Sequence, residues 1–408
     1  MKAIVCGAGI AGLTVAWHLE RAGGEVELVE HAPAFREGGY MIDFYGPGLE
    51  VAERMGLRPR LEEVRHPVHE IGFLDRDGRQ TSRLAVKAGF AGVISLLRGD
   101  LARVLAEEVR APVRYSTTVA AVRQDGGGAE VDLTDGTRHE VDLLIGADGV
   151  HSRVRELVFG PADRFVRYLG HHVAAYVLHD EDLGRRVGTR YRMLTEPGLM
   201  AGAYAVRGGG LALLFLSREP GPALPDDPAG FLRQRFGHLG WILPEVLDRC
   251  PRPPALYYDQ VTQIEAGRWS NGRVVLLGDS CQAVSLFAGH GASLAMAAAR
   301  TLADELGTVA LGTGELGTGE LGTGELGTGE LGTATLGDLS PALARYAARM
   351  RPVAARVQAS GRRFLPWMAP SGRLRMATRD LLLRLASLPG ADRLFMDAFS
   401  PGGHHLVR

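Results

Sequence analysis

The stretch AIVCGAGIAGLTVAWHLERAGGEVELVE, residues 3–30, decides the fold of this chain. Its first four residues are an apolar run that reads as a buried strand, and residues 7–12 (GAGIAG) form the pattern GxGxxG. Residues 10–21 read as a helix and residues 26–30 as a second strand. A strand, a glycine-rich turn, a helix and a second strand in this order predict a Rossmann-like dinucleotide-binding unit.

Each glycine of the pattern has a physical role. Gly7 allows the tight turn, Gly9 lets the backbone approach a pyrophosphate, and Gly12 lets the helix pack closely on the strand. The phosphates would lie at the helix N-terminus, where unpaired N–H groups and the helix dipole favour negative charge. Glu30 can accept hydrogen bonds from ribose hydroxyls and disfavours a 2′-phosphate, so the expected dinucleotide is FAD or NAD. The cofactor-binding residues predicted in this segment are Gly7, Gly9, Ala11, Gly12, Glu30 and His31.

Two later segments distinguish between these dinucleotides. Residues 142–155 read DLLIGADGVHSRVR and carry an Asp-Gly pair after an apolar run. Residues 272–280 read GRVVLLGDS, an apolar strand that ends at a Gly-Asp pair. This second segment continues to residues 289–306, which begin with GHG and then read as a helix of small residues. A carboxylate that directly follows a buried strand is well placed to meet a ligand at the edge of a sheet.

With GxGxxG near the N-terminus, a DG motif in mid-chain and a GD motif late in the chain, the sequence resembles the FAD-dependent aromatic hydroxylases of the para-hydroxybenzoate hydroxylase family (group A flavin monooxygenases). The three motifs occur in the family's order and extend from residue 7 to residue 291. The nearest resemblance is to the branch that holds tetracycline-modifying and polyketide-tailoring enzymes, which implies a role in antibiotic biosynthesis or modification. Within this family the dinucleotide is FAD.

The resemblance also implies how FAD is held. Asp279 matches the family's carboxylate for the ribityl or ribose hydroxyls, Asp148 lies in the segment that touches the pyrophosphate, and Arg98 matches an arginine before a Leu-rich helix. That helix is expected at 101–109, with Asp100 near its N-cap. The N-terminus of the helix after the GD motif would stabilise the negative charge of reduced flavin. The other cofactor-binding residues that the resemblance implies are Gly278, Gly289, Gly291, Ala292 and Ser293.

Several positions depart from the family's pattern. Its GD segment usually reads GDAAH followed by a Pro, with a Gln before the last glycine and a frequent Asn after it. The departing residues here are Ser280, Cys281, Gln282, Leu286, His290 and Ser293. Because these side chains would line the edge of the flavin, the oxygen chemistry or the substrate is expected to differ from the family norm.

The resemblance implies a monooxygenase that uses NADPH or NADH and O₂ to hydroxylate or otherwise oxygenate an aromatic or polycyclic small molecule through a flavin C(4a)-hydroperoxide. The chain carries no second nucleotide pattern, as expected if the nicotinamide docks transiently. The predicted catalytic residues are His172, Tyr204 and Asp43. Further candidates for orienting the substrate are His171, Tyr191, Arg192, Tyr40 and Tyr45, the last two close behind the pair Gly38-Gly39.

Two other readings stay open. A flavin-dependent halogenase shares the fold and motifs, but its WxWxIP signature has only a partial match in residues 240–244 (GWILP), with one Trp. The other reading is a flavoprotein oxidase or a non-oxygenating flavin-binding redox protein, which the altered GD segment favours. NAD(P)H oxidation stimulated by a substrate would separate an oxygenase from a binding protein.

The expected fold class is α/β, with a Rossmann-like FAD-binding domain (a parallel sheet with helices) interleaved with a β-sheet substrate domain and followed by C-terminal helices. The FAD-binding domain is expected at 1–70, 94–165 and 259–340, and the substrate domain at 71–93 and 166–258. Short β-rich runs at 173–178, 191–194, 200–206 and 211–216 are expected to form the sheet of the substrate domain above the flavin.

Residues 341–408 are expected to form the C-terminal helical segment. An Ala/Arg-rich helix is expected at 341–364, and 374–395 has an amphipathic Leu/Arg pattern that favours packing against the FAD-binding domain. Before it, residues 311–330 hold four copies of Leu-Gly-Thr-Gly-Glu. Such a glycine-heavy repeat predicts a flexible exposed loop.

Composition bounds the remaining properties. With 408 residues, 46% of them hydrophobic, the chain can bury a large core. A net charge of −1 gives no indication of a nucleic-acid partner, and no apolar run predicts a membrane span. The three cysteines have neither disulfide nor zinc spacing, so the expected compartment is the reducing cytoplasm and no metal site is expected. The sequence leaves the oligomeric state open between a monomer and a homodimer.

Overall fold

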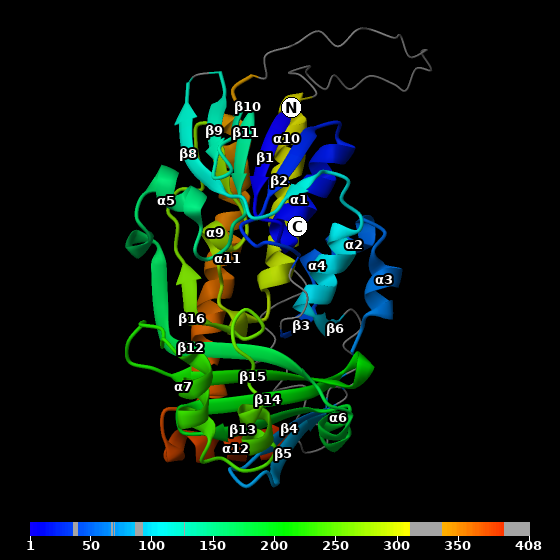
Figure 1. Cartoon of the computed structure of the whole chain (residues 1–408), viewed down its shortest axis with the longest axis vertical. Coiled ribbons are helices and arrows are strands. Elements are labelled where there is room, and N and C mark those ends of the chain that lie inside the picture. Colours follow the sequence, from blue (N-terminus) through cyan, green and yellow to red (C-terminus); the bar gives the residue numbers. More distant parts are fainter. Residues whose placement is uncertain are drawn as a thin grey trace.

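The computed structural model describes residues 1–35, 40–66, 68, 70–85, 93–125, 127–310 and 337–386. Figure 1 shows two layers stacked along the long axis, with a helix-covered parallel sheet at one end and a broad, mostly antiparallel sheet at the other. One long helix runs between them. This arrangement confirms the predicted α/β class and the β-sheet layer beside the Rossmann-like unit.

The parallel sheet has the strand order β17-β18-β11-β1-β2-β7. Central strand β1 pairs with β2 on one side and β11 on the other, and all three are parallel. Its residues 3–6 are buried, as expected for a strand covered on both faces. The strands span β1 (Lys2–Cys6), β2 (Glu25–Val29), β7 (Val113–Arg114), β11 (Leu143–Gly146), β17 (Ser270–Asn271) and β18 (Val274–Leu276).

Helices and two small sheets surround this parallel sheet. Helix α1 (Ile10–Arg21) begins directly after the glycine turn, as predicted, and packs against α10 (Gly291–Ala310). The other helices are α2 (Pro47–Arg54), α3 (Arg58–Glu63), α4 (Arg98–Ala106), α5 (Arg153–Phe159) and α9 (Asp279–Gln282), with short 3-10 turns at Ala162–Arg164 and Leu286–Ala288. The small sheets pair β3 (Met41–Phe44) with β6 (Ile94–Leu97), and β9 (Ala129–Leu133) with β8 (Val119–Gln124) on one side and β10 (Arg138–Val141) on the other.

The helix after Arg98 differs from the prediction. It begins at Arg98 itself and ends at Ala106, whereas the sequence predicted 101–109 with Asp100 near the N-cap. Asp100 lies inside the first turn and accepts a hydrogen bond from Arg103 at 2.9 Å. The acid therefore stabilises the first turn through a side-chain pair and the positive end of the helix dipole, not as a cap.

The second layer is a seven-stranded sheet of order β16-β12-β15-β14-β13-β4-β5. Helices α6 (Glu181–Val187), α7 (Pro228–Phe236) and α8 (Leu243–Asp248) cover one of its faces with an apolar cluster, and the other face turns toward the parallel sheet. The strands are β4 (Glu70–Leu74), β5 (Gln80–Ala85), β12 (Val166–His179), β13 (Tyr191–Glu196), β14 (Leu199–Val206), β15 (Gly210–Arg218) and β16 (Tyr257–Ile264). Since β16 pairs with β12, this sheet extends past the boundary that was expected at residue 258.

The C-terminal part of the described chain ties the layers together. Helix α11 (Ser340–Met368) lies along the long axis in Figure 1, and its Tyr346 hydroxyl donates to the Leu276 carbonyl of β18 at 3.2 Å. Helix α12 (Arg373–Ala386) packs on β5 of the second layer, not on the parallel-sheet layer where the sequence predicted it. Among the residues that the structure describes, no helix is long and apolar enough to cross a membrane. The repeat at 311–330 and the end of the predicted amphipathic segment lie outside the described residues.

Candidate active site

A cavity of about 340 Å³ lies where the two layers meet. Its wall on the parallel-sheet side follows the carboxyl ends of β1 and β18, the edge at which ligands bind in open α/β sheets. Its opposite wall is made by β12, β15 and β16. The predicted site residues that line the cavity are Gly9, Ala11, Asp43, Arg98, Asp279, Gly289, Gly291 and Ala292.

The glycine turn is built as the sequence predicted. Gly7 has φ +107°, and a Cβ at this position would overlap the Ala147 carbonyl of the neighbouring strand connection. Only glycine therefore fits there. A Cβ at Gly9 would meet no atom within 4 Å, and Gly9 lines the cavity. The backbone at Gly9 is thus open to a ligand.

The start of α1 offers unpaired N–H groups to the same cavity. Gly9 is its N-cap without a side-chain hydrogen bond, and the first turn carries no acid. Glu30, which the sequence predicted as a ribose acceptor, receives hydrogen bonds from the backbone N–H of Ala8 at 3.0 Å and of Ala32 at 2.8 Å. These two hydrogen bonds hold the glycine turn in place. The neighbouring residue His31 is exposed. The helix start is therefore free to bind an anion such as a pyrophosphate.

Asp279 and Arg98 approach the cavity from two different elements. Asp279 follows Gly278, whose φ of +67° turns the chain from β18 into α9. The Asp279 carboxylate makes no hydrogen bond within the described part of the chain, and surrounding protein raises its pKa above the usual value, with Arg98 opposing this shift. The Asp279 side chain is exposed to the cavity, so its carboxylate is free to accept hydrogen bonds from a ligand there.

The Asp148 side chain makes its hydrogen bonds within its own segment. The carboxylate accepts hydrogen bonds from the Ser152 hydroxyl and from the Val154 N–H, the latter at 3.0 Å, and so fixes the start of α5. Ser152 is the N-cap of that helix and accepts from the Arg155 N–H. The cavity is lined instead by residues close to Asp148 in the chain, which are Ala147, Gly149 and Val150. The DG segment therefore reaches the cavity next to Asp148.

A buried arginine joins the two motif segments, and sequence reasoning missed it. The Arg155 guanidinium is 1% exposed and donates to the carbonyl of Val150 at 2.7 Å and to that of Ser280 at 2.9 Å. The first carbonyl belongs to the DG segment and the second to the helix that carries Asp279. Arg155 thus holds the two cofactor segments at a fixed distance.

Asp43 is the titratable group with the most suitable position for acid–base chemistry. Antiparallel pairing of β3 with β6 sets Asp43 opposite Ser95, whose hydroxyl donates to its carboxylate. The surrounding protein raises the pKa of Asp43 above the usual carboxyl value although the side chain is exposed to the cavity, and the hydrogen bond from Ser95 partly opposes this shift. A carboxyl group with a raised pKa, open to the cavity, can accept or donate a proton at a pH above the ordinary carboxyl range.

Tyr45 and His290 form a pair at the start of α10. His290 Nδ1 donates to the Ala288 carbonyl at 2.6 Å, so Nε2 is the acceptor for the Tyr45 hydroxyl at 3.0 Å. Burial lowers the pKa of His290, which keeps the ring neutral. Ser293 in the same helix donates to the Tyr45 carbonyl at 2.6 Å and accepts from the Gly48 N–H at 2.8 Å. The hydroxyl of Ser293 is therefore used to hold α10 against the segment after β3.

His172 and Tyr204 do not line the cavity. Both ring nitrogens of His172 have partners, the Tyr258 hydroxyl at 3.0 Å and the Gly221 carbonyl at 3.2 Å, and burial lowers its pKa. Tyr204 is 3% exposed and its ring packs edge-on against Tyr191. Sequence patterns place both residues correctly on strands. His172 packs with Phe231 and Tyr258, and Tyr204 lies on the same face of β14 as Met200, packed against Tyr191 behind the cavity lining.

Other cavity residues come from parts of the chain that carry no motif. Tyr257 and Asp259 reach the cavity from β16, and Phe364 and Met368 reach it from the end of α11. The Asp259 carboxylate lies 3.0 Å from Nε2 of His151 in the DG segment and holds the pKa of His151 above its usual value. This ion pair links the two layers at the rim of the cavity.

The donor set of the cavity fits FAD. The uncapped helix start suits a pyrophosphate, the Asp279 carboxylate at the cavity wall suits a hydroxylated chain, and Arg98 adds a cation. The predicted residues that do not line the cavity are Gly7, Gly12, Glu30, His31, Asp148, Gly278 and Ser293. Three of these residues shape the loops that line the cavity, namely Gly7, Gly278 and Glu30.

Comparison with known proteins agrees with this geometry. Residues 1–168 match the family model of an FAD binding domain. The chain is 36% identical over 316 residues to an uncharacterised protein of Mycobacterium tuberculosis strain H37Rv, covering 74% of this chain and 84% of that protein. It is 30% identical over 339 residues to the flavin-dependent monooxygenase eupH of a Phoma species, covering 75% of this chain and 77% of that protein.

Solved structures agree in fold over nearly the whole length. The crystal structure of tetracycline destructase Tet(51) matches with a TM-score of 0.75 and 25% identity, covering 95% of this chain and 98% of that one. Klebsiella pneumoniae HpxO, complexed with FAD and uric acid, matches with a TM-score of 0.73 and 21% identity, covering 98% and 95%. At 21% identity, the similarity to HpxO shows a shared fold and nothing more.

Proposed function

The chain belongs to the flavin-dependent monooxygenase family, and from this premise we propose that the cavity between its two layers is where FAD meets the substrate. The protein is an FAD-dependent monooxygenase that acts on an aromatic small molecule. Its electron donor, the roles of its site residues and the nature of its substrate are the parts that we propose.

We assign the binding of FAD to the three elements that meet at the cavity. The N–H groups at the start of α1, behind Gly9, would bind the pyrophosphate, and Glu30 would keep that turn in place through its two backbone hydrogen bonds. Asp279 would accept hydrogen bonds from the ribityl hydroxyls, with Arg98 nearby as a counter-charge. The N-terminus of α10 at Gly291 would face the edge of the flavin ring.

Bound FAD would supply the redox chemistry, taking a hydride from NADPH or NADH and passing electrons to O₂ so that one oxygen atom enters the substrate and the other leaves as water. The protein contributes binding, orientation and exclusion of water. The cytoplasm is the compartment that we propose, because nicotinamide donors are available there and the three cysteines are free thiols.

Asp43 is the residue to which we assign proton transfer. Its carboxylate would accept the hydroxyl proton of a phenolic substrate, which makes the aromatic ring more electron-rich, and would return that proton after oxygen insertion. Ser95 keeps the carboxylate oriented through its hydrogen bond. We assign no chemical step to His172, whose ring nitrogens are both occupied, or to Tyr204, whose hydroxyl lies outside the cavity.

The cavity walls favour a flat, largely apolar substrate. Val173 and Leu214 of the seven-stranded sheet, with Phe287 and Phe364, form the apolar part of the lining. The resemblance of the fold to a tetracycline destructase supports a polycyclic phenol as the substrate class. Tyr45, held by His290, would orient the polar edge of such a molecule.

The observation that carries the proposal is the Asp279 carboxylate, which is exposed to the cavity, lacks a hydrogen-bond partner in the described chain and faces the same cavity as the uncapped start of α1. The variant Asp279→Asn loses a charged acceptor, so its affinity for FAD should fall by about tenfold or more. FAD titration of the apoprotein, followed by the flavin spectrum, measures this change.

The matched control is Asp304→Asn, an exposed acid paired with Arg300 on the outside of α10. Its affinity for FAD should equal that of the wild type. Equal affinity in both variants, or an apoprotein that takes up no FAD, would contradict the assignment of this cavity.

A further inference from the structure

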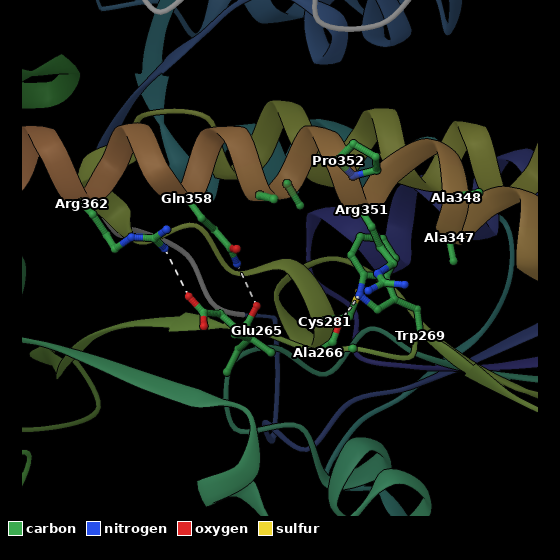
Figure 2. A pocket seen from close by; sticks show the side chains of 14 residues that line it. Glu265, Ala266, Trp269, Cys281, Ala347, Ala348, Arg351, Pro352, Gln358 and Arg362 are labelled. Atoms are coloured by element: carbon green, nitrogen blue, oxygen red, sulfur yellow. Dashed lines mark hydrogen bonds and ion pairs between the residues drawn. The ribbon is translucent and has the colours of Figure 1, made fainter.

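A second cavity lies behind the wall that carries Asp279. It measures about 580 Å³ and is bounded by α11 on one side and by residues 264–269, after β16, on the other (Figure 2). Cys281 of α9 forms part of its floor. The groove shares no lining residue with the first cavity, but α9, which runs from Asp279 to Gln282, touches both.

The groove carries an excess of positive charge. At one end Arg362 lies 3.2 Å from Glu265, and Glu265 also lies 3.0 Å from Arg167, so this acid is already shared between two cations. At the other end Arg351 points from α11 to the side on which Trp269 lies (Figure 2). The Arg351 side chain is exposed and has no ion pair or hydrogen bond within the described chain. An unpaired guanidinium at the edge of a groove favours an anionic ligand.

The walls between the two arginines are apolar. The face of α11 that lines the groove carries Ala347, Ala348, Ala354 and Ala355, and the opposite side holds Trp269 and the thiol of Cys281. Burial raises the pKa of Cys281, so the thiol stays neutral. Trp269 is only 2% exposed and Cys281 only 1% exposed, so both lie beneath the groove, and its accessible apolar wall is the alanine face of α11, with Ala348 and Ala355 exposed.

The helix wall also offers one unused acceptor. Pro352 has no N–H, so the Ala348 carbonyl one turn earlier lacks its normal helical donor. Ala348 and Pro352 both line the groove. A hydroxyl or an N–H of a ligand could satisfy this carbonyl, which sits one turn from the free guanidinium.

We propose that this groove is a binding site for an aromatic carboxylate. Arg351 would hold the carboxylate through its planar pair of donors, and the flat aromatic body would lie along the alanine face of α11, above the buried Trp269. Cys281 lies buried beneath the groove, and its thiol donates to the Gly278 carbonyl at 3.6 Å. The site therefore lies directly behind the loop that carries Asp279.

The proposal is tested with FAD-loaded protein and 2-naphthoate as the probe. Isothermal titration calorimetry gives the affinity, and a change in tryptophan fluorescence that is lost in Trp269→Phe reports the place of binding. Arg351→Gln should weaken binding by about tenfold or more, because it removes a charge-assisted bidentate contact. Ala355→Trp, which fills the groove, should weaken binding as well.

The matched control is Arg356→Gln, an exposed arginine of the same helix that does not line the groove. Its affinity for 2-naphthoate should equal that of the wild type. Absence of binding to the wild type, or equal binding by the Arg351 and Arg356 variants, would overturn the proposal. The flavin spectrum, recorded before each titration, keeps this result separate from any failure of the FAD site.

Discussion

Arg155 is the residue on which the geometry of the active site depends most heavily. Its guanidinium is 1% exposed and donates to the Val150 carbonyl at 2.7 Å and to the Ser280 carbonyl at 2.9 Å. These carbonyls belong to two segments that are far apart in the sequence and meet at the cavity. Replacing Arg155 by Met keeps a long side chain but removes both hydrogen bonds.

The size of the effect follows from these contacts. A hydrogen bond from a charged donor contributes about 1.5–3 kcal/mol, so two bonds give about 3–6 kcal/mol. Met no longer buries a charge, and this relief offsets part of the loss, since burial already lowers the pKa of Arg155. We expect Arg155→Met to reduce the free energy of unfolding by about 2–4 kcal/mol and to weaken FAD binding by about tenfold.

Urea denaturation of the apoprotein and FAD titration measure the two changes. Arg153→Met is the matched control, because Arg153 lies on the same helix, is 47% exposed and has a surface ion pair with Glu156 at 2.8 Å. This pair should contribute no more than about 1 kcal/mol. If Arg155→Met and Arg153→Met unfold at the same urea concentration and bind FAD equally, other contacts hold the two segments, and the role given to Arg155 is wrong.

Three further variants test the roles of the predicted catalytic residues. If Asp43 accepts the substrate proton, kcat/KM should rise with pH through its raised pKa, above the ordinary carboxyl range, and Asp43→Asn should lose both this acid limb and most of the activity; an unchanged pH profile would remove Asp43 from the mechanism. Because the pKa of Asp43 is higher in the folded than in the unfolded protein, protonated Asp43 stabilises the fold. This stabilisation is fully present below the ordinary carboxyl pKa and is lost as the pH rises through the pKa of the folded protein. Asp43→Asn should abolish that pH-dependent loss in denaturation curves recorded across pH. His172→Phe breaks two buried hydrogen bonds and should cost about 1–3 kcal/mol of unfolding free energy, with no change in the pH profile of kcat; a shifted profile would restore a chemical role. Tyr204→Phe removes a buried hydroxyl that has no hydrogen-bond partner in the described chain, so both unfolding free energy (within about 0.5 kcal/mol) and NADPH oxidation should stay at the wild-type level; a large loss of activity would show that the hydroxyl reaches the substrate.

The local part of the fold follows from sequence patterns. The strand before the glycine turn, the helix at 10–21 and the second strand were predicted from apolar periodicity and glycine spacing, because these signals act between residues close in the chain. The same reasoning placed Gly9, Asp279 and Arg98 at one site through the family's motifs, and the cavity brings all three together. The start of α4 was missed by three residues because helix ends depend on weak capping signals.

The remaining part depends on contacts between distant segments. Asp259 meets His151 only because β16 pairs with β12 and carries Asp259 to the rim of the cavity. Phe364 reaches the cavity because α11 runs from one layer to the other. His172 carried a catalytic prediction on residue type alone, and its partners Tyr258 and Gly221 are distant in the sequence. No local pattern encodes these pairs.

The fate of molecular oxygen shows directly whether the protein is a monooxygenase. The FAD-loaded protein is supplied with NADPH and oxygen-18 gas, together with the polycyclic phenol that most accelerates NADPH oxidation. If the protein is a monooxygenase at this cavity, one labelled oxygen atom appears in the product, and Asp279→Asn loses this incorporation together with FAD. If the phenol accelerates NADPH oxidation but gains no label, and hydrogen peroxide forms in equal amount to the NADPH consumed, the protein is an oxidase and not a monooxygenase.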